Sequence, residues 1–146
     1  MKPKPHSHSL RKGRHSEPGH YYLVTAVTLD RQPIFQDFQA ARALINILRE
    51  ASLRHQAQTW AYVVMPDHFH WLLQLEEPSL SETIRRVKRV ASVQLGRRVW
   101  QDGFHDRAVR GEENLKAMAR YVIANPVRAG LVESVGDYSH WDAAWL

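Results

Sequence analysis

The segment VVMPDHFHWLL, residues 63–73, places two histidines in a stretch that otherwise has the composition of a buried β-strand. Successive side chains of a strand point to opposite faces of a sheet, so His68 and His70 share one face while Phe69 and Trp71 share the other. Neutral imidazoles bind divalent metals well, and a strand would hold the pair rigid. The spacing therefore indicates a metal site, although an exposed polar face or two hydrogen-bonded core histidines would explain the pair equally well.

Two imidazoles do not complete the coordination shell of a metal ion, and the C-terminal part of the chain offers further groups. Tyr121 and Asn125 are four residues apart, a spacing that puts two side chains on one face of a helix. Pro126 disfavours helical dihedrals at Asn125, so the two residues share a face only if the last turn stays regular. The more common interpretation is structural, with Tyr121 at the rim of the core and Asn125 at the end of the helix before Pro126.

The elements that must position these residues follow from hydrophobic periodicity, which predicts the order β, α, β, β, α, β, α in a single domain. Hairpins mixed with crossover helices suit an α+β fold, in which helices pack mainly on one face of a central antiparallel sheet. The expected strands are residues 20–29, 59–65, 68–75 and 104–109, and the expected helices are residues 38–54, 79–95 and 112–124.

Composition limits the classes of function that are open to this chain. It has 146 residues, a net charge of +5 and no cysteine, which excludes disulfides, thiolate metal sites and a cysteine nucleophile. We find no apolar run that could span a bilayer and no secretory signal, so we expect a soluble, cytoplasmic protein. Residues 1–18 hold five Lys and Arg against one Glu, and we expect a flexible basic arm there, followed by one domain at residues 19–146.

Basic groups occur in two places where they would suit a polyanion such as nucleic acid. A solubilising tail and a solvated helix face explain the same charges about as well. Trp100 and Phe104 are expected to be available for stacking on bases. The residues expected to hold phosphates are Arg11, Lys12 and Arg14 in the arm, and Arg85, Lys88 and Arg89 on one face of the second helix.

Three segments in order, VVMPDHFHWLLQL, VWQDGFHDRAVR and YVIANPVRAGLV, resemble the single-tyrosine HUH transposases, and most closely the REP-associated tyrosine transposases. The match runs from residue 20 to about residue 140. The resemblance implies a ferredoxin-like fold, with His68 and His70 as metal ligands, Tyr121 as the nucleophile and Asn125 as a further ligand. One position departs from the family pattern, since the residue before the first histidine is usually Asn and is Asp67 here.

The function that this resemblance implies is a metal-dependent single-stranded DNA endonuclease and transesterase, which cleaves and rejoins hairpin-associated DNA through a 5′-phosphotyrosine intermediate. Its cofactor would be Mg²⁺ or Mn²⁺, and its partner single-stranded or hairpin DNA, with no membrane and as a monomer or a homodimer. One alternative is a domesticated protein that binds hairpin DNA without strand transfer. Another is a His-x-His enzyme of small-molecule chemistry in an all-β barrel, against which the three helical patterns argue.

Overall fold

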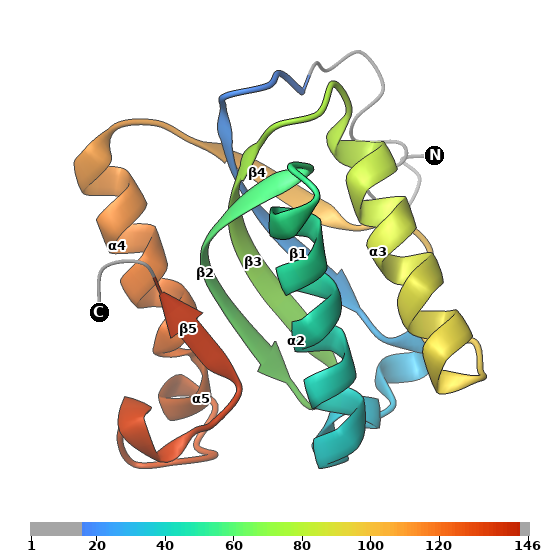
Figure 1. The fold of residues 1–146 in the computed structure, drawn as a ribbon. Helices are drawn as coiled ribbons and strands as arrows, with labels where there is room; N and C mark the ends of the chain where they lie inside the picture. The colour runs from blue at the N-terminus through green and yellow to red at the C-terminus, as the bar shows by residue number, and fades with distance from the viewer. Residues whose placement is uncertain (1–15, 144–146) are drawn as a thin grey trace, which may run out of the picture.

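Five strands form one antiparallel sheet, in the spatial order β4-β1-β3-β2-β5, at the centre of the protein (Figure 1). The structure is a computed structural model that describes residues 16–143. Strand β3 carries both histidines and lies between β1 and β2, which pair with it along nearly its whole length. The strands are β1 (Tyr21–Val27), β2 (Ala57–Met65), β3 (His68–Leu75), β4 (His105–Val109) and β5 (Trp141–Ala143).

Helices lie on both faces of the sheet. Figure 1 shows α2 (Phe38–Leu53) and α3 (Leu80–Leu95) on one face and α4 (Glu112–Ile123) on the other. The short helix α5 (Asn125–Arg128) follows α4 after one residue. The α+β class and the antiparallel sheet are confirmed, and the third long helix covers part of the face that α2 and α3 leave open. Short 3₁₀ turns occur at Leu29–Arg31, Ile34–Gln36 and Val135–Asp137.

Side chains at the ends of α2 and α3 explain where these helices begin and end. The Asp37 carboxylate accepts a hydrogen bond from the backbone N–H of Ala40 (2.9 Å), and the Ser79 hydroxyl accepts one from that of Glu82 (3.2 Å). Each bond satisfies an N–H that has no partner inside the helix. Gly96, with φ of +67°, ends α3 in the left-handed region that favours glycine. The boundaries predicted from these residues are confirmed.

Alternation along β3 separates the core from the histidine pair. Phe69 and Trp71 are fully buried in the core beneath α2 and α3. His68 and His70 point to the opposite face, where their neighbour Leu72 is buried beneath α4. One strand therefore anchors the sheet through its apolar face and holds both imidazoles on the other face.

Two aromatic residues that we expected to stack on bases belong to the core instead. Trp100 is buried between Phe35 and Phe69, with ring centroids 5.5 Å from each, and its indole N–H donates to the Lys88 carbonyl oxygen (3.0 Å). Phe104 is buried in the same cluster. The expectation of stacking is wrong for both, because their rings fill the space where α3 meets the sheet.

Strand β5 was not expected from the sequence. Its three residues, Trp141–Ala143, pair with Ala61–Val63 at the edge of β2, and the Tyr138 hydroxyl just before it donates to the Val64 carbonyl oxygen (2.6 Å). Three residues are too few for a periodic pattern, so only the pairing with β2 reveals this strand. Within residues 16–143, no helix is long and apolar enough to cross a membrane.

Candidate active site

His68 and His70 form a close imidazole pair on the α4 face of the sheet. Their ring centroids are 4.9 Å apart and their planes are inclined at 81°. Both residues are partly buried, and the side chain of His68 is 17% exposed. A strand that is paired on both sides holds these two imidazoles rigidly, as two candidate ligands of a metal site require.

Each histidine has a hydrogen-bond partner at its Nδ1 atom. The Nδ1 of His68 lies 2.7 Å from a carboxylate oxygen of Asp67, and the Nδ1 of His70 lies 2.7 Å from the Thr25 hydroxyl on β1. When Nδ1 carries the proton and donates these bonds, Nε2 keeps its lone pair in both rings. Metal-binding histidines commonly have such a partner, which sets the tautomer and the orientation of the ring.

Asp67 is itself held in place by the turn that follows β1. Its second carboxylate oxygen accepts a hydrogen bond from Arg31 (3.1 Å), and its backbone carbonyl oxygen accepts bonds from the backbone N–H (2.9 Å) and hydroxyl (3.1 Å) of Thr28. Burial alone would raise the pKa of Asp67, but the hydrogen bonds from His68 and Arg31 lower it overall. The carboxylate is therefore charged at neutral pH and suited to accept from His68.

The electrostatic environment favours the neutral form of His70. Burial lowers the pKa of His70 to about 4, and electrostatic interactions with His68 and Arg128 act in the same direction. A neutral imidazole at pH 7 is the form that binds a cation, because protonation occupies the lone pair on Nε2. At pH 7, His70 is therefore already in the neutral form that can bind a metal ion.

Helix α4 brings Tyr121 to the histidine pair of the same chain. The Tyr121 ring centroid lies 6.4 Å from that of His70, and the side of the helix that contains Leu115, Ala119 and Val122 packs on the sheet. Tyr121 is 49% exposed, so the phenol is accessible from solvent. A solvent-accessible tyrosine therefore lies beside the histidine pair within one chain, although about fifty residues separate them in the sequence.

Arg128 contacts both the ring and the backbone of Tyr121. Its guanidinium carbon lies 3.9 Å from the Tyr121 ring centroid, and one of its nitrogens donates to the Tyr121 carbonyl oxygen (2.8 Å). The cation stacks on the ring while the hydrogen bond fixes the distance between α4 and α5. We did not predict this contact, because closeness in the sequence does not establish contact in space.

Asn125 lies one turn beyond Tyr121, where the helical path is nearly unbroken. Ala124, between α4 and α5, has right-handed helical dihedrals (φ −83°, ψ −3°), and the Arg128 N–H bonds to its carbonyl oxygen (3.0 Å). The condition for Tyr121 and Asn125 to share a face is therefore met. The side-chain Nδ2 of Asn125 is buried without a hydrogen-bond partner. Since a half-turn exchanges amide nitrogen and oxygen, that position suits an oxygen ligand for a cation.

The predicted donor set is the two imidazoles of His68 and His70 and the amide of Asn125. Within residues 16–143, no group of three or more His, Cys, Asp or Glu lies in a metal-binding arrangement. A shell built on His68 and His70 therefore depends on a ligand of another type, and the buried amide of Asn125 is of that kind. The metal role of these three residues remains a prediction.

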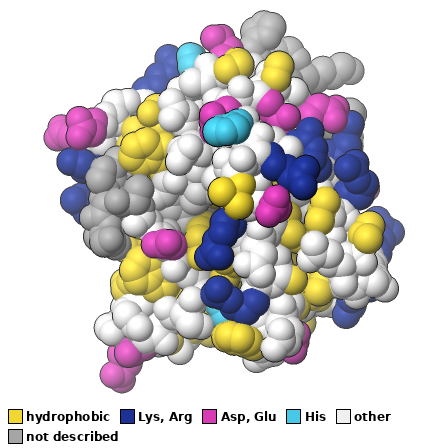
Figure 2. Space-filling view, in the orientation of Figure 1, with side chains coloured by type: hydrophobic (Ala, Val, Ile, Leu, Met, Phe, Trp, Pro, Cys, Tyr) yellow, Lys and Arg dark blue, Asp and Glu magenta, His cyan; other side chains and the backbone are white. Residues whose placement is uncertain are grey.

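The α3 arginines that we expected to bind phosphates lie on the other side of the sheet from the histidine pair. Arg85 and Arg89 are both exposed, and Arg85 donates to the Glu82 carboxylate (2.8 Å). Figure 2 shows Lys and Arg gathered over the α3 side of the face it draws, with Asp and Glu between them. Their phosphate-binding role stays a prediction, and Arg11, Lys12 and Arg14 lie outside the described residues.

Lys88 differs from its neighbours on α3 because its ammonium group is bonded inside the protein. It donates to the carbonyl oxygens of Gln101 (2.9 Å) and Gly103 (2.7 Å), in the segment that leads into β4. Burial lowers the pKa of Lys88 to about 8, against the weaker effect of Asp102. These bonds give Lys88 a clear role in tying α3 to the approach to β4, and its predicted phosphate contact would compete with them.

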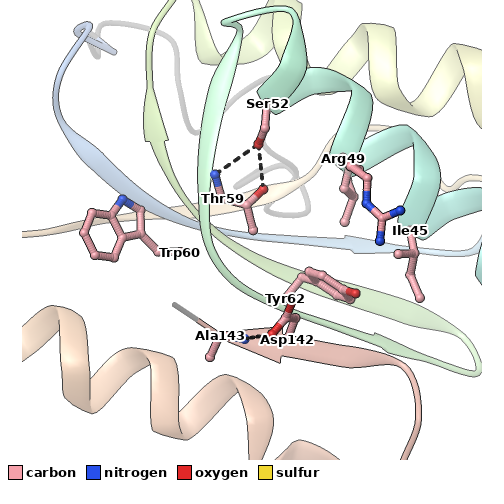
Figure 3. A pocket seen from close by; sticks show the side chains of 9 residues that line it. Ile45, Arg49, Ser52, Thr59, Trp60, Tyr62, Asp142 and Ala143 are labelled. Carbon is pink, nitrogen blue, oxygen red and sulfur yellow. Dashed lines mark hydrogen bonds between the residues drawn. The ribbon is translucent and has the colours of Figure 1, made fainter. Parts of the chain in front are cut away.

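A separate hollow of about 210 Å³ lies between α2, β2 and β5, and Figure 3 shows the residues that line it. The Ser52 hydroxyl lies 3.2 Å from that of Thr59, which also accepts the indole N–H of Trp71 (2.9 Å). These hydroxyl groups support the packing of α2 against the sheet. The hollow opens on the α2 side of the sheet, so it is not part of the site that holds His70 and Tyr121.

Comparison with known proteins identifies the class. The chain belongs to the family described as "Transposase IS200 like", whose model matches residues 16–125. It is therefore an enzyme, a DNA transposase. The family resemblance recognised in the sequence is confirmed.

Individual relatives are more specific. Over 122 residues the chain is 31% identical to the REP-associated tyrosine transposase of Escherichia coli (strain K12), covering 81% of this chain and 72% of the relative. It also matches the solved structure of a REP-associated tyrosine transposase bound to a REP hairpin, with a TM-score of 0.73 and 25% identity. That match covers 88% of this chain and 79% of the other. Both likenesses support a REP-associated tyrosine transposase.

Proposed function

We propose that this protein is a metal-dependent single-stranded DNA endonuclease and transesterase, which cleaves and rejoins hairpin-associated DNA with Tyr121 as the nucleophile. The observation that carries the proposal is the 6.4 Å separation of the Tyr121 and His70 rings within one chain. A phosphate held at the histidine pair would lie within reach of the phenol. Membership of a transposase family supplies DNA as the substrate class.

His68, His70 and Asn125 would hold a divalent cation, Mg²⁺ or Mn²⁺. The fit rests on the two Nδ1 hydrogen bonds, which leave the Nε2 lone pairs available to a metal when Nδ1 carries the proton, and on the buried, unpartnered amide atom of Asn125. Such a cation supplies charge neutralisation at the phosphoryl oxygens as negative charge develops there. Imidazole ligands favour Mn²⁺ over Mg²⁺ in binding strength.

The protein's own groups carry the bond exchange. The Tyr121 phenolic oxygen attacks the phosphorus and loses its proton to solvent, the bond to the 3′-oxygen breaks, and that oxygen takes up a proton. The products are a 5′-phosphotyrosine and a free 3′-hydroxyl. A second 3′-hydroxyl reverses the exchange and joins new strands without ATP, because the phosphotyrosine conserves the broken bond. Arg128, stacked on the ring, keeps the phenol oriented for attack.

The substrate that fits this site is single-stranded DNA at the base of a hairpin. A tyrosine on a packed helix does not reach a phosphate in a stacked duplex while the same strand bends into a metal site. The structural neighbour is bound to a REP hairpin, which supports a hairpin as the element recognised. Basic residues of the arm and of α3 are the proposed phosphate contacts outside the site, and residues 19–146 the proposed catalytic domain.

The test is incubation with hairpin DNA that carries single-stranded flanks and a label at its 3′ end, in Mn²⁺, followed by a denaturing gel. We expect a protein–DNA adduct that retains the 3′ label, because the protein is attached to the 5′ phosphate of the downstream fragment. Tyr121→Phe is expected to bind the hairpin and form no adduct, while Tyr62→Phe, on the α2 face, forms adducts normally.

Two further arms separate the alternatives. His68→Ala and EDTA are both expected to stop adduct formation, and full activity in EDTA would remove the metal from the proposal. Adducts that persist in Tyr121→Phe would exclude Tyr121 as the nucleophile. A wild-type protein that binds the hairpin and never forms an adduct would favour the alternative of a hairpin-binding protein without strand transfer.

A further inference from the structure

The face of the sheet that carries the histidine pair is only partly covered. Helix α4 packs on β2 and β3, where Leu72 and Ala61 are buried beneath it. The same cluster buries Leu23 of β1 and Val109 of β4, but Thr25 is only partly buried and His105 and Arg107 are exposed. An uncovered strip of sheet surface therefore extends from the candidate active site towards the β4 edge.

Strand register defines the order of side chains across this strip. Thr25 is paired directly with His70 on one side and with His105 on the other, so the three residues form a row across β3, β1 and β4. Neighbouring strands are about 4.8 Å apart, which places the backbone of His105 about 10 Å from that of His70. Arg107, paired with Leu23, lies two residues further along the same face of β4.

The exposed cation of this strip has no internal partner. Among residues 16–143, the side chain of Arg107 forms no hydrogen bond or ion pair, whereas that of Arg31 bonds to Asp67 and that of Arg85 to Glu82. On β4, Asp106 lies between His105 and Arg107 in the sequence and so points to the opposite face of the sheet. A guanidinium without a partner and an exposed imidazole are both groups that contact nucleic acid, through phosphate and base respectively.

We propose that His105 and Arg107 form a track for the single-stranded flank of the substrate, with Arg107 on a phosphate and His105 stacked on a base, leading to His70 and Tyr121. This inference rests on the proposed function, which supplies DNA as the occupant. The row continues directly into the candidate site through Thr25, and the positive charge complements a phosphate backbone. The exposed arginines of α3 lie on the opposite face of the sheet and do not border this row.

The experiment measures binding by fluorescence anisotropy at several salt concentrations, with a blunt hairpin, the same hairpin with oligo(dT) flanks, and oligo(dT) alone. We expect Arg107→Ala to weaken binding of the flanked hairpin about fivefold, and to reduce the slope of log affinity against log salt by about 0.7, as for one lost single-strand phosphate contact. His105→Ala is expected to weaken it about fivefold or more, and His105→Phe to restore it. Affinity for the blunt hairpin should not change.

Arg54→Ala is the matched control, because it removes the same charge from an exposed arginine at the end of α2. It should change neither affinity nor salt slope. The track is refuted if Arg107→Ala behaves like this control, if blunt and flanked hairpins lose equal affinity, or if the wild type shows no preference for flanked over blunt hairpins. Binding is measured without cleavage, so it tests the track independently of the proposed chemistry. Absence of a tyrosine adduct would refute that chemistry and would not affect the binding results.

Discussion

The guanidinium of Arg128 lies over the ring of Tyr121, 3.9 Å from the ring centroid, and donates to the carbonyl oxygen of the same residue at 2.8 Å. The contact joins α5 to α4 at the point where the helical path passes Ala124. It therefore couples the orientation of a candidate nucleophile to the short helix that begins with Asn125.

We expect Arg128→Met to slow adduct formation about tenfold, while hairpin binding changes little. The substitution keeps much of the side-chain volume and removes the stacked cation and the hydrogen bond, each of which contributes about 1 kcal/mol. Arg128→Lys should recover only part of the rate, because an ammonium does not stack as a planar guanidinium does. Single-turnover rates on a denaturing gel give the answer, and a wild-type rate for Arg128→Met would exclude the positioning role.

A mixture of two inactive variants tests whether one chain completes the site. Because His70 and Tyr121 meet within a single chain, His68→Ala and Tyr121→Phe proteins should form no adducts when mixed. Wild-type protein diluted into the same mixture serves as the positive control. Recovery of adducts in the mixture would mean that the histidines of one chain work with the tyrosine of another.

Asp67 should strengthen metal binding through His68. We expect Asp67→Ala to weaken Mn²⁺ binding at least about tenfold, since partners of metal-binding histidines commonly contribute that much. Asp67→Asn, which still offers an oxygen to the Nδ1 hydrogen, should lose less. Electron paramagnetic resonance of free Mn²⁺ measures the affinity without DNA, with Glu76→Gln as a control carboxylate away from the site. Equal affinity in Asp67→Ala and wild type would contradict the role.

The low pKa of His70 predicts a pH dependence of stability in metal-free protein. The unfolded chain binds a proton near pH 6.5 and the folded chain only near pH 4, so stability is fully present above 6.5 and falls as the pH drops through this window. At about 1.4 kcal/mol for each pH unit, the loss reaches about 3 kcal/mol by pH 4.

Denaturant unfolding in EDTA at pH 7, 5.5 and 4 measures this loss, with His70→Asn for comparison. The variant has no titrating group at this position, so its free energy of unfolding should fall less between pH 7 and 4. His140, whose pKa burial also lowers, is present in both proteins and contributes equally to each. Parallel curves for the two proteins would show that His70 titrates normally.

Local patterns were sufficient for most of the secondary structure. Asp37, Ser79 and Gly96 mark helix ends through bonds or dihedrals that involve only near neighbours, so α2 and α3 were predicted closely. The hairpin of β2 and β3 followed from two apolar runs on either side of one turn. Strand β5 escaped prediction because its three residues owe their conformation to pairing with β2, and Trp100 was misjudged because its burial depends on α3 packing over it.

The candidate site was likewise predictable from the sequence only in part. Sequence alone determined that His68 and His70 share a face of a strand, because the period of two residues is a local property of the backbone. It placed Tyr121 and Asn125 on one face only on condition that the helical path continues past Ala124, which the structure shows. Only the tertiary structure showed that the Tyr121 ring lies beside that of His70, that Thr25 and Asp67 support the imidazoles, and that His105 lies in line with His70. Those neighbours arise from strand register and helix docking between distant segments, which no local spacing specifies.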